Sequence, residues 1–192
     1  MKKFEDVLLY KITRPIITVL FRFLYTPKII GTENIPKDGR VVLAGNHTNN
    51  FDCLLLISAT KRNIHFLAKN ELWKGVKKII FSNMGLIPVD RTKHDHSALE
   101  NAYGYLNNNK VVGIFPEGTT EKNRGLLPFK IGAIKIAYET NSSIIPFVIT
   151  GNYRLFSKNL KIEFLKPMKL KTDNLTNEND KLYNLIKSKL EE

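Results

Sequence analysis

Short apolar segments alternate with segments of helical length along most of this 192-residue chain. The apolar segments are residues 41–44, 64–68, 86–89, 111–115, 144–149 and 162–165. Their length, their valine and isoleucine content and the turn residues between them predict buried strands. Strands that alternate with helices form a parallel sheet with helices packed on its faces. We therefore expect an α/β fold, a single-domain α/β sandwich with a mostly parallel mixed sheet, over residues 29–192.

The segments between the strands have helical character. Helices are expected at residues 52–58, 71–81, 99–106, 131–140 and around 182–190. One helix has apolar residues at positions i, i+3, i+4 and i+7, namely Leu99, Ala102, Tyr103 and Leu106. That spacing puts the four side chains on one helix face, which is the face a sheet covers.

Residues 1–28 have a different pattern from the rest. Apolar residues in 4–25 repeat at helical spacing on both sides of Pro15, which predicts an N-terminal amphipathic helix pair. The first 30 residues carry six cations and two acids, with aromatic residues among them. A basic, aromatic-containing helix pair is typical of an anchor at a membrane surface. A helical cover over the core has the same pattern, so both interpretations stay open.

The formal net charge of the chain is +12, from 30 lysines and arginines against 18 acids. A positive electrostatic potential attracts nucleic acid, anionic membranes, or phosphorylated and CoA-like substrates. The basic residues are spread along the chain and no nucleic-acid-binding motif is present, so we expect no nucleic-acid partner. No stretch approaches the roughly 20 apolar residues of a membrane-spanning helix, and the N-terminus lacks a signal-peptide pattern.

A polar loop with one histidine and one aspartate follows the strand at 41–44. Two residues five apart, such as His47 and Asp52, lie about 140° apart on a continuous helix. They meet only if a strand ends near Gly45 and a helix starts near Asp52. The carboxylate would then accept a hydrogen bond from one imidazole nitrogen and leave the other as a base. On this stretch alone, a helix-capping aspartate beside an exposed loop histidine is the simpler interpretation.

Three further motifs follow later strands. They are Lys69-Asn70-Glu71-Leu72, Gly85 to Arg91, and Phe115-Pro116-Glu117-Gly118-Thr119 with Phe129-Lys130-Ile131-Gly132 beyond it. The ends of parallel strands gather along one edge of the sheet, where ligands bind. Together with the His-x4-Asp spacing, this order over about residues 40–150 resembles the glycerolipid acyltransferase family, specifically the 1-acylglycerol-3-phosphate acyltransferases.

The resemblance implies that His47 is a general base oriented by Asp52. It also implies that the substrate-binding residues are Lys69, Arg91, Glu117, Gly118, Thr119 and Lys130. Arginine can hold a phosphate bidentately, whereas the two lysines would act as point charges. Each lysine has the alternative of a solvated surface charge, and Pro116-Glu117-Gly118 has the alternative of an ordinary turn after a strand. Thr120 departs from the family, which commonly has arginine there, and this leaves the acceptor open.

The expected activity is transfer of a fatty acyl group to the hydroxyl of 1-acylglycerol-3-phosphate, giving phosphatidic acid in phospholipid biosynthesis. The donor would be acyl-CoA or acyl-carrier protein, with no cofactor. The acceptor could instead be another lysophospholipid or glycerol-3-phosphate. The expected partners are an anionic membrane surface, the donor and a lysophospholipid acceptor. The expected location is the cytoplasmic face of the cell membrane, as a peripheral or interfacial protein.

Other chemistries fit the sequence less well. A non-catalytic membrane-surface binding protein stays open as an alternative. An esterase or thioesterase is disfavoured because there is no Gly-x-Ser-x-Gly nucleophile elbow. Cys53 lies in an apolar run, where we expect a small buried hydrophobic residue rather than a nucleophile. We expect no metal, because His94-Asp95-His96 lacks a third ligand at useful spacing.

Overall fold

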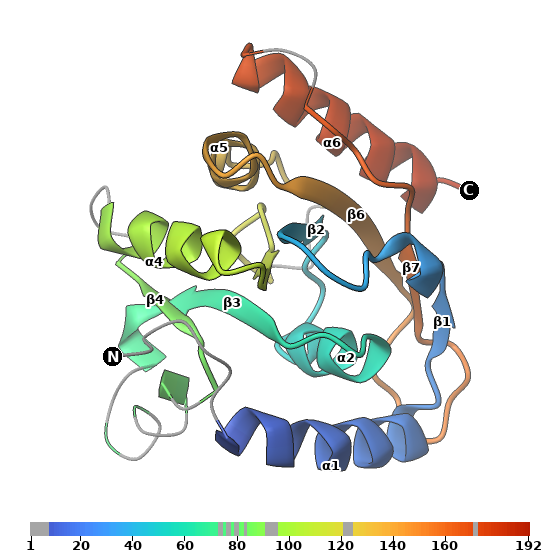
Figure 1. The fold of residues 1–192 in the computed structure, drawn as a ribbon. Coiled ribbons are helices and arrows are strands. Elements are labelled where there is room, and N and C mark those ends of the chain that lie inside the picture. The colour runs from blue at the N-terminus through green and yellow to red at the C-terminus, as the bar shows by residue number, and fades with distance from the viewer. Residues whose placement is uncertain are drawn as a thin grey trace.

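The computed structural model describes residues 8–72, 75, 78, 81–82, 84–90, 96–120, 125–170 and 173–192 (Figure 1). The strands are β1 (Lys28–Ile30), β2 (Val41–Gly45), β3 (Ile64–Lys69), β4 (Ile87–Val89), β5 (Val111–Ile114), β6 (Ser143–Thr150) and β7 (Lys161–Phe164). The α-helices are α1 (Leu8–Tyr25), α2 (Asp52–Ala59), α4 (His96–Asn107), α5 (Gly132–Glu139) and α6 (Leu175–Leu190). Two 3-10 turns, η1 (Thr32–Asn34) and η2 (Asn70–Leu72), complete the described elements.

The seven strands form one sheet in the order β1-β7-β6-β2-β5-β3-β4. Every neighbouring pair is parallel except β6 and β7, which are antiparallel. In the centre, Val41 of β2 is in register with Val111 of β5 and Ser143 of β6. The expected α/β sandwich with a mostly parallel mixed sheet is confirmed.

Helices cover both faces of the sheet, with α1 and α2 on one side and α4, α5 and α6 on the other (Figure 1). Alternate residues of β2 supply the two cores. Val41 and Leu43 pack in the α1–α2 core, and Val42 and Ala44 pack in the α4–α6 core. All four are fully buried, which explains why the sequence of this strand is continuously apolar and does not alternate between apolar and polar residues.

The N-terminal helix pair expected from the sequence is wrong for the described residues, because α1 is a single helix that continues through Pro15. A proline inside a helix removes a hydrogen bond and costs about 3 kcal/mol. Burial of apolar side chains offsets that cost. Tyr10, before the proline, and Phe21, after it, are both buried in the same core, so packing keeps the two halves of the helix aligned.

Element boundaries differ modestly from those expected. The C-terminal helix begins at Leu175, where the Asn174 side chain accepts a hydrogen bond from the Asn177 N–H and caps it. The segment at 71–81, expected to be helical, starts as η2, and most of the remainder lies outside the described residues. Among the described helices, none combines the length and the hydropathy that crossing a bilayer would need.

Candidate active site

The loop between β2 and α2 brings His47 and Asp52 together. β2 ends at Gly45 and α2 begins at Asp52, and the chain turns between them. His47 Nδ1 lies 2.8 Å from Asp52 Oδ2. A Cβ atom on Gly45 would lie 2.3 Å from the carbonyl oxygen of Phe147, so only glycine allows this close approach of β2 to β6. The turn that the spacing required is therefore present.

The Asp52 carboxylate is fully buried and surrounded by hydrogen-bond donors. Oδ2 accepts from the backbone N–H of Thr48 at 2.6 Å and of Asn49 at 2.9 Å, in addition to its contact with His47. Oδ1 accepts from the Thr48 hydroxyl at 3.1 Å and from the Tyr153 hydroxyl. A buried carboxylate needs such partners to remain ionised. The capping alternative does not describe this residue, because the helix N-cap is Phe51.

The imidazole of His47 is held by Asp52 and Phe115, and its backbone is held by Glu117. Its ring stacks on Phe115, with the ring centroids 4.0 Å apart and the planes 14° from parallel. Its backbone N–H donates to Glu117 Oε1 at 2.7 Å. Because Nδ1 faces Asp52, Nε2 lies on the opposite side of the ring, where a substrate hydroxyl can reach it. The side chain is only 16% exposed.

Glu117 holds the loop that carries His47. While Oε1 accepts from His47, Oε2 accepts from the backbone N–H of Leu127 at 3.0 Å, and the side chain is buried. The carboxylate thus joins the ends of β2 and β5 to the segment that leads into α5. Its expected contact with acceptor hydroxyls stays a prediction.

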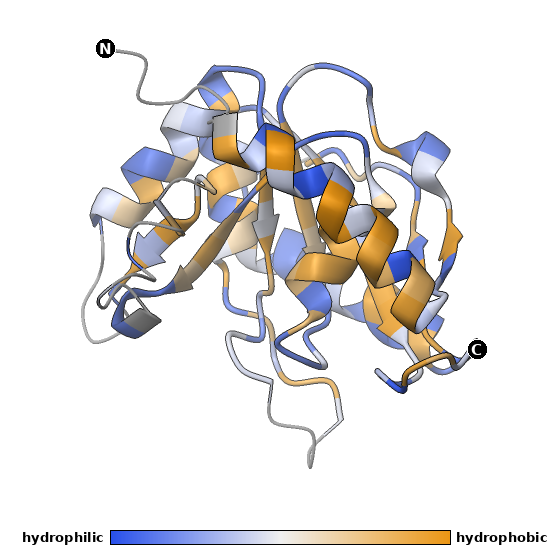
Figure 2. Cartoon of the chain, turned by 90° about the horizontal axis from the view of Figure 1, so that it is seen from below, coloured by the Kyte–Doolittle hydropathy of each residue, from blue (hydrophilic) through white to orange (hydrophobic). Residues whose placement is uncertain are grey.

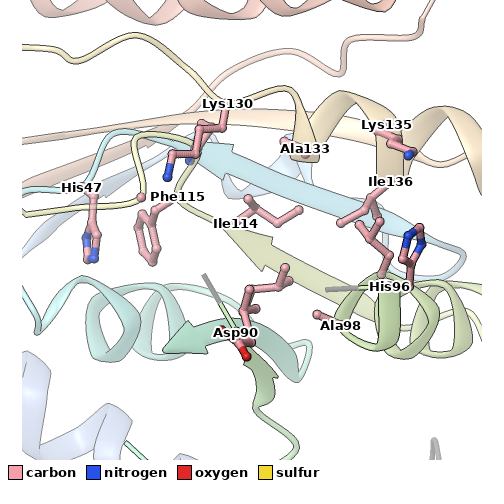
Figure 3. Close-up of a pocket in the computed structure, with 16 residues that line it drawn as sticks. His47, Asp90, His96, Ala98, Ile114, Phe115, Lys130, Ala133, Lys135 and Ile136 are labelled. Atoms are coloured by element: carbon pink, nitrogen blue, oxygen red, sulfur yellow. The ribbon is translucent and has the colours of Figure 1, made fainter. Parts of the chain in front are cut away.

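A cavity of about 480 Å³ opens beside His47 (Figure 3). Its walls come from β3, β4, β5, α4 and α5. The apolar lining includes Leu67, Val89, Ala98, Leu99, Ile114, Ala133 and Ile136. The polar lining residues are His47, Asp90, His96, Lys130 and Lys135. His47, Phe115 and Lys130 lie toward one end of the cavity, and His96 and Lys135 toward the other (Figure 3). An apolar cavity with a charged mouth suits a molecule that has a polar head and an apolar tail.

Gly118 and Lys130 lie together at the His47 end of this cavity. Gly118 has φ +72°, and a Cβ atom on it would lie 3.2 Å from Lys130 Nζ. The Lys130 backbone N–H donates to the Pro116 carbonyl at 2.9 Å, which holds the two segments side by side. Glycine at this position therefore leaves room for the ammonium group beside the base.

The remaining expected site residues are more dispersed. Lys69 is exposed at the end of β3, and Thr119 is partly exposed after Gly118. Neither is among the described residues that line the cavity. Arg91, the residue best suited to bidentate phosphate binding, lies outside the described residues.

A second cavity, of about 660 Å³, is also bordered by His47. Its lining includes Asn46, His47, Thr48, Glu117, Leu126, Ile149, Thr150, Tyr183, Lys187 and Leu190. Sequence reasoning did not assign any of α6 to the site, because nothing in its pattern distinguishes Tyr183 or Lys187 from other surface residues. His47 thus contacts two cavities, which is what a reaction between two substrates requires.

Sequence reasoning also missed two residues that support the loop. The Asn46 amide donates to the Ile149 carbonyl at 2.8 Å and accepts from the Ile149 N–H at 2.7 Å, which ties the end of β2 to β6. Asn46 was detectable as the polar residue between a buried strand and the histidine. Tyr153, 101 residues from Asp52, gave no sequence signal.

Cys53, beside Asp52, and the histidine-containing segment at 94–96 are the remaining candidates for nucleophile and metal chemistry. Burial and then the neighbouring Asp52 carboxylate raise the pKa of the Cys53 thiol to about 12, so the thiol stays protonated. Among the described residues, no three His, Cys, Asp or Glu side chains group as a metal site, and His94 and Asp95 lie outside those residues.

The chain matches known proteins over most of its length. A family model for acyltransferases matches residues 26–150. Over 135 residues the chain is 33% identical to a 1-acyl-sn-glycerol-3-phosphate acyltransferase of Borreliella burgdorferi, covering 69% of this chain and 54% of that protein. The same kind of protein from Bacillus subtilis is 30% identical over 150 residues, covering 74% of this chain and 72% of the relative.

A solved structure has the same fold. The crystal structure of the 1-acyl-sn-glycerophosphate acyltransferase PlsC from Thermotoga maritima aligns with a TM-score of 0.71 at 23% identity, covering 95% of this chain and 77% of that one. At this identity the likeness establishes the fold alone. The chain spans about half the length of several of its curated relatives, including those of Borreliella burgdorferi and Haemophilus influenzae.

Proposed function

This chain belongs to the acyltransferase family, and from that premise we propose that it transfers a fatty acyl group to the hydroxyl of 1-acylglycerol-3-phosphate. The product would be phosphatidic acid, and the donor a thioester, acyl-CoA or acyl-carrier protein. The observation that carries the proposal is the His47–Asp52 pair, in which a buried carboxylate orients an imidazole that contacts two cavities.

The pair is suited to general base catalysis without an acyl-enzyme. His47 Nε2 takes the proton of the acceptor hydroxyl while the hydroxyl oxygen attacks the thioester carbonyl. The new ester C–O bond forms, the C–S bond breaks, and the proton on His47 returns to the leaving thiolate. Asp52 keeps the Nδ1 proton in place, which fixes the tautomer. Proton transfer by a positioned base typically contributes about 10²–10⁴ in rate, and holding both substrates together contributes further.

The cations near His47 are suited to the phosphate of the acceptor. Lys130 lies beside the base at the mouth of the apolar cavity, so it is placed for a phosphate whose acyl tail enters that cavity. We assign the phosphate to Lys130 together with Lys69 and Arg91, and assign Gly118, Thr119 and Glu117 to the acceptor backbone and hydroxyls. Thr120 stands where the family commonly has arginine, so Lys130 carries more weight in this assignment.

The α1 helix is suited to contact with a membrane surface. Its outer face consists of Ile12, Ile16, Val19, Leu20 and Phe23, whose exposed fractions range from 53% to 72%. Leu155 and Phe156, in the loop after β6, extend this apolar surface, and the Phe156 ring contacts Phe23. Figure 2 shows α1 crossing the molecule with hydrophobic residues along its visible side.

The guanidinium groups of the α1 arginines donate to carbonyls at the end of α2, although the Arg22 side chain is itself exposed. Arg14 donates to the carbonyl of Thr60, and Arg22 donates to the carbonyl of Ser58, both at the C-terminal end of α2. Since the outward side chains are then mainly apolar, water is a poor environment for this face. Exposed cations at its edges, such as Lys11 and Arg154, favour anionic headgroups. We therefore assign residues 1–28 as an interfacial anchor, at the cytoplasmic face of the cell membrane.

The full chain, acyl-CoA and vesicles containing lysophosphatidate test the proposal directly. We expect equal amounts of free thiol and phosphatidate. Free thiol with free fatty acid would indicate a hydrolase, and neither product would indicate a membrane-binding protein without chemistry. Replacing acyl-CoA with acyl-carrier protein identifies the donor. Replacing lysophosphatidate with glycerol-3-phosphate or other lysophospholipids identifies the acceptor.

A further inference from the structure

Tyr153 lies in the loop after β6 and reaches back to the buried carboxylate of the dyad. Its hydroxyl donates to Asp52 Oδ1. The other four donors to this carboxylate come from three residues of the turn itself, namely His47, Thr48 and Asn49. Among the described contacts of Asp52, Tyr153 is therefore the donor that connects the turn to a distant part of the chain.

The two carboxylate oxygens are held unequally. Oδ2 accepts from His47 Nδ1 and from the two backbone N–H groups, so its position is set by the turn. Oδ1 accepts from the Thr48 hydroxyl at 3.1 Å and from Tyr153. Thr48 belongs to the same turn as Asp52 and moves with it, whereas the Tyr153 hydroxyl is carried by a ring packed outside the turn. Tyr153 thus resists rotation of the carboxylate plane, which determines the direction in which Oδ2 meets His47.

The Tyr153 ring is itself fixed by aromatic neighbours. It contacts Phe21 and Tyr25 of α1 edge-on, with ring centroids 6.2 and 5.7 Å away, and Phe51 at 6.0 Å. Edge-to-face aromatic pairs prefer centroid distances of about 4.5–7 Å. The inner side of α1, whose outer face is the proposed membrane contact, is therefore packed directly on the residue that holds Asp52.

The hydroxyl remains a donor under working conditions. Burial, followed by the Asp52 charge and the hydrogen bond to it, raises the pKa of Tyr153 above its usual range. A protonated phenol donates a hydrogen bond to the carboxylate, whereas a phenolate would be repelled by the carboxylate charge.

We infer that Tyr153 is a positioning residue for the acyl transfer, acting through Asp52 to align His47 and to join the dyad to the inner side of α1. The inference rests on the proposed function, which supplies the reaction that His47 serves. It extends that function by adding a third residue, remote in sequence, to the support of the base.

Tyr153→Phe is the informative variant because it keeps the ring packing and removes only the hydroxyl. We expect kcat to fall about tenfold, since a hydrogen bond to a charged group is lost, while the KM values for donor and acceptor stay within about twofold. Tyr25→Phe is the matched control. It removes a hydroxyl from the same aromatic cluster without a contact to Asp52, and should keep wild-type kcat.

A second readout separates this inference from the proposed function. The NMR signal of the His47 Nδ1–H proton, followed in the full chain, needs no substrate. In Tyr153→Phe the Asp52 carboxylate loses the donor that fixes its plane, so its hydrogen bond to this proton is held less firmly. The signal is therefore expected to broaden through faster exchange with water, and in Tyr25→Phe it should not change.

The outcomes are distinguishable. If the wild type forms no phosphatidate, the proposed function fails, and the His47 Nδ1–H signal still decides whether Tyr153 acts through Asp52. If the wild type is active, an unchanged kcat in Tyr153→Phe overturns the inference. A fall in kcat with an unchanged His47 Nδ1–H signal, or with a matching loss of thermal stability, also overturns it, because the effect would then be structural.

Discussion

Two amphipathic helices from opposite ends of the chain, α1 and α6, cover opposite faces of the same sheet, yet their outer faces differ. On α6, Leu182 and Ile186 are buried, and Leu185, at 39%, is the only large apolar residue of the helix among the strongly exposed ones. On α1, five apolar residues form an outer face that is more than half exposed. α6 therefore has one apolar face, packed on the sheet, and a polar face toward water. α1 is apolar both on the side packed on the core and on its outer side.

The charged residues of the two helices have different partners. Arg14 and Arg22 of α1 donate to carbonyls at the end of α2, where the helix dipole favours cations. Lys189 of α6 stays at the surface and pairs with Glu163 of β7 at 3.3 Å. The α1 side of the molecule thus combines an exposed apolar face, for which we propose a membrane surface, with contacts that reach the dyad through Tyr153 and Asp52.

Asp52→Asn should produce the largest effect among changes on the α1–α2 side. The amide cannot accept from all the donors that surround it, and it no longer fixes the His47 tautomer. We expect kcat to fall about 10²–10⁴-fold and the free energy of unfolding to fall by about 1–3 kcal/mol. Steady-state kinetics and chemical denaturation measure the two losses. Activity near the wild-type level would contradict the role given to Asp52.

The double substitution Val19→Glu and Phe23→Glu tests the outer face of α1. Burying each apolar side chain in lipid is worth about 1.5–3 kcal/mol, so losing two should lower vesicle affinity by roughly 10²–10⁴-fold. Leu185→Glu on α6 is the matched control and should bind anionic vesicles like the wild type. Vesicle sedimentation measures both. Equal losses in the two variants would mean that the helices do not differ in function.

Lys130→Ala tests what the cavity on the α4–α5 side of the sheet contributes to acceptor binding. The KM for the phosphorylated acceptor should rise about tenfold, because one charge-assisted contact to the phosphate is removed, with kcat changed less. Lys135→Ala, at the far end of the same cavity, should change the acceptor KM by a smaller factor. An equal rise in both variants would indicate a general effect of charge rather than a phosphate contact at Lys130.

Glu163→Gln should have the smallest effect, on stability alone. The hydrogen bond from Lys161, followed by contacts with Lys189, holds the pKa of Glu163 below its usual value. A lowered folded-state pKa contributes stability above the unfolded value and loses it as the pH falls through the folded one. At pH 7 we expect a loss below about 1 kcal/mol, since the pair is near the surface. Thermal melting at neutral and acid pH should show the difference vanish on acidification.

Much of the fold was predictable because it is specified locally. Runs such as Val41–Ala44 are apolar on both faces, and this identifies a buried parallel strand without further information. The expected break at Pro15 was wrong because local propensity was outweighed by the packing of Tyr10 and Phe21 in a shared core. Similarly, the cations of α1 could be counted but not oriented, since their partners on α2 are 36 and 46 residues away.

In the candidate site, too, local features were predictable from the sequence and contacts between distant residues were not. The meeting of His47 and Asp52 followed from spacing and a turn, both local features. The partners of Glu117 and the reach of Tyr153 depend on contacts 70 and 101 residues apart in sequence. Such contacts form only when β2, β5 and β6 lie side by side, so a single sequence holds no local signal for them.

The turnover of His47→Ala tests the central claim most directly. The full-length variant would be assayed with acyl-CoA and lysophosphatidate in anionic vesicles, with vesicle binding and thermal stability measured on the same sample. The account predicts a loss of phosphatidate formation of about 10²–10⁴-fold with binding and folding retained. Phosphatidate formation near the wild-type rate would contradict it, because the imidazole between the two cavities would then not be the base.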